Sequence, residues 1–421
     1  MGFRFIVVTL ALTLGVGFSP VQAQEVVQKQ VFEAGAYRTR GGGNIANVRI
    51  GYQTMGTLNA ARDNAVLIAH FFSGNSHAFG RLAAGGPVGY WDAIIGPGKA
   101  IDTDRYFVIS SDTLTNLNVP DANTVTTGPS SINPETGRPY GLTFPVVSMR
   151  DFVEVQKRLL DQLGVRRLAL VTGASMGALQ AMEWAAAYPE MVARVMPVIA
   201  HDIDPWNLAW LDVWEAPIRM DPNWRQGDYY GQGRTPPLAG LAEALRIVTL
   251  QSRDRAWARG LGMRAAEGND PARNIMDRFA IEKWLDDAAT ARARTSDANA
   301  FLYLIRANQL FFNEYETPEA AFTRSQARWL VVPTPGDRVF PIEGVREMVM
   351  TEVRRMVIEG ETRGEAKGKA EDLLAVLTAR GLSVSDEQRA RIVGCTDIAR
   401  LHRWVVKAAT AQSVAEALAQ E

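Results

Sequence analysis

Residues 168–184 read LALVTGASMGALQAMEW, an apolar run that enters Gly173-Ala174-Ser175-Met176-Gly177 and continues into a helical pattern. This is the G-x-S-x-G motif between a buried strand and a helix, the setting in which it presents a nucleophile. The glycines permit a sharp turn that lifts the Ser175 hydroxyl above the strand end. The Met176 amide, at the helix start, is expected to face a developing oxyanion. We therefore predict a nucleophilic Ser175; the alternative is a tight turn with an idle serine.

Runs rich in Val and Ile alternate with helical patterns along much of the chain, which is typical of a mostly parallel sheet covered by helices. The predicted strands are residues 48–54, 65–70, 106–110, 168–172, 195–200 and 328–333. The predicted helices include 149–163, 176–188, 238–249 and 299–312. Residues 202–325 show no strand pattern, so we expect a helical lid inserted into an α/β domain that spans 24–353.

Two further groups are expected near Ser175. Asp337 follows the strand at 328–333 through a turn and is the predicted acid, although Gly336-Asp337 also reads as an ordinary turn. Phe72, two residues beyond the strand at 65–70, is the predicted second backbone donor of the oxyanion hole. His70 and His77 lie in the same loop and are expected to organise it, because the base of such a triad follows the acid in chain order.

At these residues the chain resembles the homoserine O-acetyltransferase family of the α/β-hydrolase superfamily, over about residues 32–353. The resemblance implies an α/β-hydrolase fold, with Ser175 as the acyl-accepting nucleophile and Asp337 as the triad acid. It also implies an oxyanion hole formed by the amides of Phe72 and Met176. In the family, the serine takes an acetyl group from acetyl-CoA and passes it to the homoserine hydroxyl. The segments that carry the resemblance include GYQTMGTLNAARDNAVLIAHFFSGNSHAFG, TGPSSINPETGRPYG, GASMGALQAMEWAAAYPE and IRMDPNWRQGDYY.

The family's catalytic histidine, on a loop after a last strand, has no counterpart here. Only His402 follows Asp337, and Glu359-Gly-Glu-Thr-Arg stands where that loop is expected. We expect the last strand to be lost. His402 and His201 are the candidate replacement bases; the alternatives are an ordinary helix histidine at 402 and a hydrogen bond that anchors the lid at 201. A serine without a base is a weak nucleophile, so an inactive binding or interaction protein is the rival interpretation.

The C-terminal residues 354–421 are predicted to be a small helical appendix. They resemble the C-terminal tails of bacterial proteins related to PD-(D/E)XK transposases, which lack the nuclease carboxylates. Gly381 is expected to end one helix, and the capping spacings Ser385 to Gln388 and Ser413 to Glu416 are expected to open two more.

The first 23 residues have the features of a secretory signal: Arg4, an apolar run over 5–18, Pro20, and a small residue before the predicted cleavage after Ala23. The run is shorter than the roughly 20 residues that span a bilayer, so no membrane span is expected after cleavage. We predict a periplasmic or secreted protein. Such a protein would not meet acetyl-CoA, so water or a small alcohol is the expected acyl acceptor.

The composition limits the classes of partner and cofactor that the chain is expected to bind. Among 421 residues, 45 are Lys or Arg and 46 Asp or Glu, which leaves no basic excess for nucleic acid. The four histidines and one cysteine have no metal-ligand spacing, and no nucleotide-binding motif is present, so no metal or cofactor is predicted. The expected partner is a small-molecule acyl substrate, and a homodimer is left open. Trp206, Trp210 and Trp214 predict a helix face in the lid that forms either core or an acyl channel.

Overall fold

The structure is a computed structural model that describes residues 26–419, with the backbone alone over 351–365. The predicted secretory segment, residues 1–23, lies outside the described residues. The strands are β1 (Gln30–Arg38), β2 (Asn44–Met55), β3 (Ala65–Ala69), β4 (Ile95–Gly96), β5 (Ile101–Asp102), β6 (Phe107–Ser111), β7 (Ile132–Asn133), β8 (Arg138–Pro139), β9 (Leu168–Ala174), β10 (Arg194–Val198) and β11 (Arg328–Trp329). The helices are α1 (Met149–Gln162), α2 (Met176–Ala187), α3 (Pro205–Met220), α4 (Leu238–Gln251), α5 (Arg255–Leu261), α6 (Ala280–Ala293), α7 (Ala298–Gln309), α8 (Pro318–Arg324), α9 (Ile342–Ala379), α10 (Asp386–Val393), α11 (Ile398–Ala408) and α12 (Val414–Ala417).

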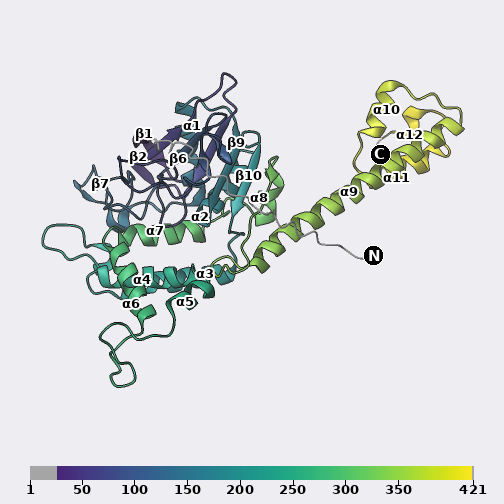
Figure 1. Ribbon diagram of the computed structural model, residues 1–421. Helices are drawn as coiled ribbons and strands as arrows, with labels where there is room; N and C mark the ends of the chain where they lie inside the picture. The colour runs from purple at the N-terminus through teal and green to yellow at the C-terminus, as the bar shows by residue number, and fades with distance from the viewer. Residues whose placement is uncertain (1–25, 420–421) are drawn as a thin grey trace, which may run out of the picture.

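A seven-stranded sheet in the order β1-β2-β6-β3-β9-β10-β11 forms the centre of the molecule (Figure 1). The pairs β1/β2 and β2/β6 are antiparallel, and the remaining pairs, from β6 to β11, are parallel. Parallel neighbours end at the same edge of a sheet, so the segments that follow β3, β9, β10 and β11 come together there.

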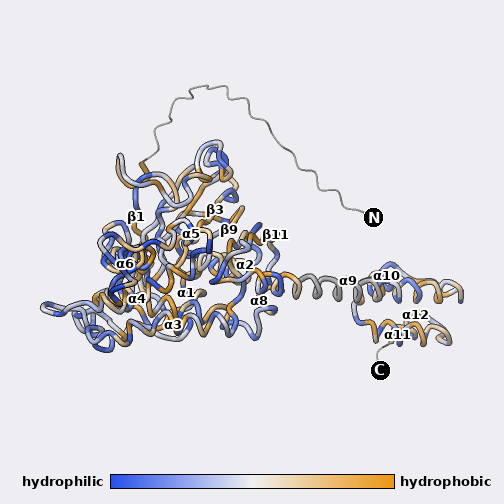
Figure 2. Tube along the Cα trace, turned by 60° about the horizontal axis from the view of Figure 1, so that its bottom comes forward, coloured by the Kyte–Doolittle hydropathy of each residue, from blue (hydrophilic) through white to orange (hydrophobic). Residues whose placement is uncertain are grey.

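The strand β3 shows how the sequence builds the two faces of this sheet. All five of its residues are buried, and successive side chains point to opposite faces. Leu67 joins the larger hydrophobic core, which includes α1 and α2, whereas Val66 and Ile68 join a second core with Phe79. The strands β3 and β9 accordingly run as hydrophobic stretches through the body of the protein (Figure 2).

The predicted fold class is confirmed, and all six predicted strands are present, five of them with small shifts at their ends. The sequence missed β1, whose pairing with β2 is interrupted by register shifts on both sides of Gly35, so its polar and apolar residues do not alternate cleanly. The strand predicted at 328–333 was too long. It forms a continuous ladder only at β11, with one further bridge from Val332 to Val198, because Pro197 on the neighbouring strand β10 has no N–H to donate between them.

The helices α1 and α2 pack together, and α2 also covers β3, β9 and β10. The start of α1 is fixed by a capping box in which Ser148 and Asp151 satisfy each other's backbone amides. In the predicted lid region, Asp204 caps α3, and Pro205 occupies the first turn. The helix α3 packs against α4 and α7, and α4 packs against α6, whereas α8 packs against α2.

The helix α9 runs without a break from Ile342 to Ala379, so the predicted boundary between residues 353 and 354 falls inside it. Its distal part packs with α10 and α11 around a separate hydrophobic core that includes Leu373, Leu401 and Trp404. Figures 1 and 2 show these C-terminal helices at the far end of α9 from the sheet. Within residues 26–419, no strand follows β11, and no helix has both the length and the apolar content to cross a membrane.

Candidate active site

Ser175 stands on the sharp turn between β9 and α2. Its φ of 55° and ψ of −124° lie where residues other than glycine are rare, as expected for a strained turn at a functional site. The flanking glycines are required by packing, because a Cβ at Gly173 or Gly177 would come within 2.4 or 2.2 Å of the Ala69 carbonyl oxygen. The turn therefore lies directly against the end of β3.

The same contact joins the start of α2 to the loop that carries Phe72. Met176 is the first residue of α2, so its amide has no carbonyl four residues earlier within the helix to bind. The loop after β3 is held to α2 by a hydrogen bond from Gln180 Nε2 to the His70 carbonyl oxygen, 3.1 Å long. Two residues further on, Phe72 lines the same pocket as Ser175. Of the two predicted donors, Phe72 thus lines the pocket and Met176 directly follows Ser175 in the chain; their role in an oxyanion hole stays a prediction.

A cavity of about 30 Å³ adjoins Ser175. By this measure a single water requires about 10 to 15 Å³, so there is room for a small group. The lid helix α3 supplies Trp210 and Trp214 to the wall, whereas Trp206 is exposed. None of the lining residues carries a formal charge; they are Phe72, Ser175, Ile203, Asn207, Trp210, Leu211, Trp214, Gln251, Asn308, Val339 and Phe340.

Asp337 lies in the loop that follows β11. One of its carboxylate oxygens accepts hydrogen bonds from the amides of Val339 and Phe340, both 2.8 Å long. Burial raises the pKa of the Asp337 carboxyl, while these two amides and the nearby His201 act to lower it. Because Val339 and Phe340 line the Ser175 cavity, Asp337 fixes one of its walls.

Two side chains that the sequence did not reveal join this loop to the lid. Gln251, at the end of α4, accepts a hydrogen bond from Trp214 Nε1 at 2.7 Å and donates one to the Arg338 carbonyl oxygen at 3.1 Å. Asn207 donates to the Val339 carbonyl oxygen at 2.9 Å. Gln251 belongs to no local motif, and Asn207 forms the capping box of α3 with Asp204, which gives no sign of its second bond to Val339; only the folded chain shows that both bridge two elements of the pocket.

His70 and His77 take the organising places predicted for them. The His70 ring lies 2.8 Å from the Phe71 carbonyl oxygen through Nδ1 and 3.2 Å from Asn116 Nδ2 through Nε2. Burial lowers the pKa of His70, so the neutral ring is favoured. The His77 Nε2 lies 3.1 Å from the Gly80 carbonyl oxygen.

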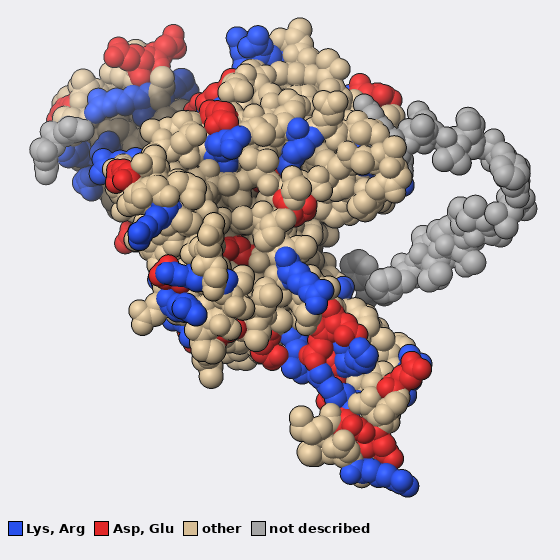
Figure 3. All heavy atoms as spheres, turned by 90° about the vertical axis from the view of Figure 1, so that its left-hand side faces the viewer, with Lys and Arg blue, Asp and Glu red and all other residues tan. Residues whose placement is uncertain are grey.

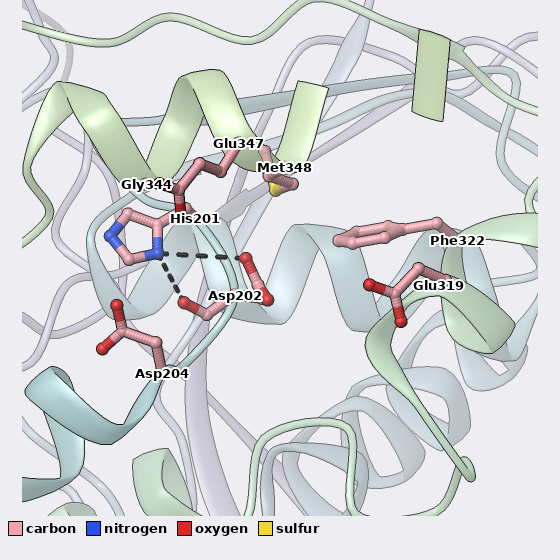
Figure 4. Close-up of a pocket in the computed structure, with 8 residues that line it drawn as sticks. All are labelled: His201, Asp202, Asp204, Glu319, Phe322, Gly344, Glu347 and Met348. Atoms are coloured by element: carbon pink, nitrogen blue, oxygen red, sulfur yellow. Dashed lines mark hydrogen bonds and ion pairs between the residues drawn. The ribbon is translucent and has the colours of Figure 1, made fainter. Parts of the chain in front are cut away.

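His201 follows β10 and is 2% exposed. Its Nδ1 lies 2.5 Å from the Asp202 carbonyl oxygen and 3.9 Å from an Asp202 carboxylate oxygen, as the dashed lines in Figure 4 show. Its Nε2 is buried and has no hydrogen-bond partner among the described residues. The ring meets that of Phe340 edge to face, with 5.2 Å between centroids.

A second hollow of about 180 Å³ lies on the side of His201 shown in Figure 4. Four carboxylates line it, and no lysine or arginine does; they are Asp202, Asp204, Glu319 and Glu347. Burial raises the pKa of Asp202, and the neighbouring Glu319 and Asp204 also raise it. The nearby His201 acts to lower it. No cluster of described residues has the geometry of a metal site.

His402 is exposed on α11, in the group of C-terminal helices that packs on the distal part of α9. Figure 1 shows that group at the far end of α9 from the nucleophile turn. On the molecular face in Figure 3, acidic and basic side chains are interspersed rather than gathered by sign.

Residues 103–343 match the α/β hydrolase fold family. Homoserine O-acetyltransferase from Symbiobacterium thermophilum is 41% identical over 315 residues, which cover 73% of this chain and 80% of that protein. The counterpart from Methanohalobium evestigatum is 37% identical, and the match spans 73% of this chain but only 62% of that relative's length.

Solved structures give the same grouping. Esterase E22 is similar with a TM-score of 0.72 and 45% identity, over 76% of this chain and 90% of that one. Homoserine O-acetyltransferase from Bacillus anthracis is similar with a TM-score of 0.73 and 34% identity, over 77% and 87%. Together with the strained serine turn and the pocket beside it, these similarities show that the chain belongs to the homoserine O-acetyltransferase family of the α/β hydrolase fold.

Proposed function

We propose that this protein is a serine-dependent acyl transferase that acts mainly as a hydrolase of small esters. The observation that carries the proposal is the strained Ser175, held against the end of β3 with its side chain at an uncharged cavity and the Met176 amide beside it. A strained backbone at the mouth of a cavity is typical of a functional residue.

The reaction has two steps. In the first, Ser175 Oγ attacks the ester carbonyl, the amides of Met176 and Phe72 stabilise the oxyanion, and the alcohol leaves with the proton that the serine gave up. In the second, water attacks the acyl-serine bond, which releases the carboxylic acid and returns the proton to Ser175. An alcohol in place of water gives a new ester instead.

The pocket favours a small acyl group and an uncharged acceptor. Its volume of about 30 Å³ suits an acetyl group better than a long chain. Homoserine carries an ammonium and a carboxylate, and burying charges without partners is costly. Because no lining residue is charged, water or a neutral alcohol is the better acceptor. The similar proteins include both an esterase and acetyltransferases, which is consistent with either acceptor.

The secretory features of residues 1–23 lead to a second part of the proposal, that the protein acts outside the cytoplasm. Cell fractionation tests it: the mature chain is expected in the periplasm or medium, and retention of the full-length chain in the cytoplasm would contradict it. In that case acetyl-CoA would again be available as a donor.

Two assays test the nucleophile. A fluorophosphonate probe reports whether Ser175 can be labelled, and p-nitrophenyl acetate reports whether the protein hydrolyses a small ester. Wild type is expected to be labelled and to hydrolyse the ester, and Ser175→Ala is expected to do neither. Equal labelling of both proteins would show that another residue reacts. Acetyl-CoA with homoserine serves as the competing reaction, and O-acetylhomoserine formed faster than free acetate would overturn the preference for a neutral acceptor.

One observation favours a second candidate, a binding or interaction protein without catalysis. Within the described residues no histidine nitrogen is hydrogen-bonded to Ser175, and α9 occupies the residues where a last strand and its histidine loop were expected. In that case the correctly folded protein would show no labelling while still binding small esters or their acids.

A further inference from the structure

We propose that His201 is the general base that activates Ser175 in this protein. The inference rests on the proposed function and goes beyond it, because it names the group that takes the proton. In chain order the base would then lie between the nucleophile and the acid.

The other three histidines are excluded by their surroundings. Both ring nitrogens of His70 are engaged, Nδ1 with the Phe71 carbonyl and Nε2 with Asn116. His77 has its Nε2 engaged by the Gly80 carbonyl and lies in the loop after β3, away from the strand β11 that leads to Asp337. His402 is exposed on α11, at the far end of α9 (Figure 1). Since the chain contains only four histidines, His201 is the one that remains.

The order of the strands places His201 between the nucleophile and the acid. Ser175 follows β9 and Asp337 follows β11, and β10, which leads to His201, lies between them. The register supports this, since Val198 pairs with Ala174 on one side and bridges to Val332 on the other. His201 also influences the ionisation of Asp337, so the two side chains are within electrostatic reach.

The hydrogen bond at Nδ1 prepares the ring to act as a base. The Asp202 carbonyl oxygen can only accept, so in the neutral ring the proton is on Nδ1 and the lone pair is on Nε2. That Nε2 is buried without a hydrogen-bond partner. An unsatisfied buried polar atom costs free energy, and a catalytic role is one reason for a native protein to keep one.

The backbone around His201 is shaped for the ring. Ile199, two residues earlier, has a φ of 48°, which is an outlier for a β-branched residue. Gly344, at the start of α9, leaves the space that the imidazole fills, because a Cβ there would come within 2.5 Å of Nε2. Strain at one position and a required glycine at another are the features expected where the geometry of a side chain matters.

The catalytic step needs a limited movement. Nε2 is not hydrogen-bonded to Ser175 in this conformation, and the Phe340 ring both contacts His201 and lines the Ser175 cavity. Substrate that fills the cavity would press on Phe340 and let the imidazole turn toward Oγ. His201 Nε2 then takes the Ser175 proton as the Oγ–carbonyl bond forms and gives it to the leaving alcohol as the ester C–O bond breaks.

The resulting imidazolium would be surrounded by acids. Asp202 follows His201 in the same loop, Asp337 lies within electrostatic reach on the loop after β11, and the hollow beside the ring presents Asp204, Glu319 and Glu347. A group that becomes positively charged during the reaction is stabilised by such neighbours.

The test compares the rates at which Ser175 of the full-length protein reacts, with the fluorophosphonate probe for labelling and with p-nitrophenyl acetate for acylation. His201→Gln and His201→Ala are expected to slow acylation at least about 100-fold, the usual contribution of a general base. His402→Ala is the matched control and should react like wild type. Circular dichroism and thermal unfolding show whether each variant is folded.

Two further measurements separate catalysis from structure. In wild type the acylation rate should depend on pH through the base, and this dependence should be absent in His201→Gln. Added imidazole should restore part of the activity of His201→Ala. If wild type is labelled at Ser175 and folded His201→Gln is labelled equally fast, the base is another group and the inference fails while the proposed function stands. If wild type is not labelled at all, the proposed function fails with it.

Discussion

Gly177 lies against Ala69 so closely that a Cβ at position 177 would come within 2.2 Å of the Ala69 carbonyl oxygen. The contact joins the start of α2 to the end of β3, and so joins the nucleophile turn to the loop that carries Phe72. Gly177→Ala is therefore expected to force the two backbones apart.

The predicted cost of Gly177→Ala is about 1 to 3 kcal/mol of unfolding free energy, the range for overpacking, together with a loss of ester hydrolysis. Urea unfolding and p-nitrophenyl acetate turnover measure the two effects. Gly260→Ala, on α5 with no atom within 4 Å of its new Cβ, is the control and should be neutral or stabilising. Wild-type activity in Gly177→Ala would show that the close approach is not needed.

Arg150 and Glu183 form a buried ion pair between α1 and α2, with Nε and Oε1 2.6 Å apart. Burial raises the pKa of Glu183, and Arg150 opposes that effect. Arg150→Met leaves the buried carboxylate without a charged partner and with only a 3.4 Å hydrogen bond from the Tyr315 hydroxyl, so we expect a loss of about 3 to 5 kcal/mol near neutral pH. The loss should be smaller in acid. Without Arg150, the pKa of Glu183 is raised further above its unfolded value, so the folded state is favoured when Glu183 is protonated and is destabilised as the pH rises and Glu183 ionises.

Thermal and urea unfolding at pH 5 and pH 8 test this prediction. The double variant Arg150→Met with Glu183→Leu should recover much of the stability, because no charge is then left buried. Lys157→Met, which removes an exposed partner of Asp161, is the control and should cost well under 1 kcal/mol. The same loss at both pH values would contradict the assignment to the Glu183 charge.

Trp210 is half-buried on α3 and lines the Ser175 cavity. Trp210→Ala should enlarge the cavity and shift the preference from acetyl toward hexanoyl esters. A hexanoyl group has four more methylene groups than an acetyl group, and burying two of them in the enlarged cavity corresponds to about 1.6 kcal/mol, so the ratio of kcat/KM values is expected to change at least tenfold. Trp206→Ala, whose ring is 58% exposed, is the control and should leave the ratio unchanged. An unchanged ratio in Trp210→Ala would place the acyl group elsewhere.

Asp337→Asn keeps an oxygen that can accept the amides of Val339 and Phe340, so the loop should hold its shape. The negative charge is lost, and with it the stabilisation of an imidazolium nearby. Hydrolysis is expected to fall more than tenfold, while unfolding free energy changes by less than about 1 kcal/mol. Asp254→Asn, a capping residue of α5, is the control. Full activity in Asp337→Asn would exclude this carboxylate from catalysis.

Trp404 is 3% exposed in the core formed by the C-terminal helices, and Arg391 lies over its ring at 5.2 Å. Trp404→Ala should destabilise that core by about 3 to 5 kcal/mol and speed limited proteolysis between α9 and α12. Labelling of Ser175 should be unaffected, since this core is separate from the larger one. A parallel loss of labelling would show that the appendix supports the active site.

Much of the fold could be predicted because it depends on local patterns. The apolar runs of β3 and β9 and the stop of α2 before Pro189 can be read from neighbouring residues alone. The strand β1 was missed because its interrupted register hides the alternation, and the continuity of α9 across residue 354 was missed because composition changes there while helical geometry does not.

The site residues also fall into those that the sequence predicts and those that only the folded structure reveals. Ser175, Met176 and Phe72 follow from motif and spacing, and the structure gathers them at one cavity or beside it. The pairing of Gln251 with Trp214, or the closeness of His201 to Phe340, depends on elements that meet only after folding. The catalytic roles of these residues and the resemblance of the tail remain predictions.

In a parallel sheet, the residues that follow neighbouring strands lie at the same edge of the sheet, whatever their order in the sequence. Ser175, His201 and Asp337 follow the three neighbouring strands β9, β10 and β11, so they lie at the same edge of the sheet. In chain order, however, the histidine comes before the acid rather than after it. An imidazole at the end of the middle strand is spatially equivalent to one delivered by a later segment. Under the proposed mechanism, a histidine on the loop after β10 would supply the base without any change to the strands of the sheet.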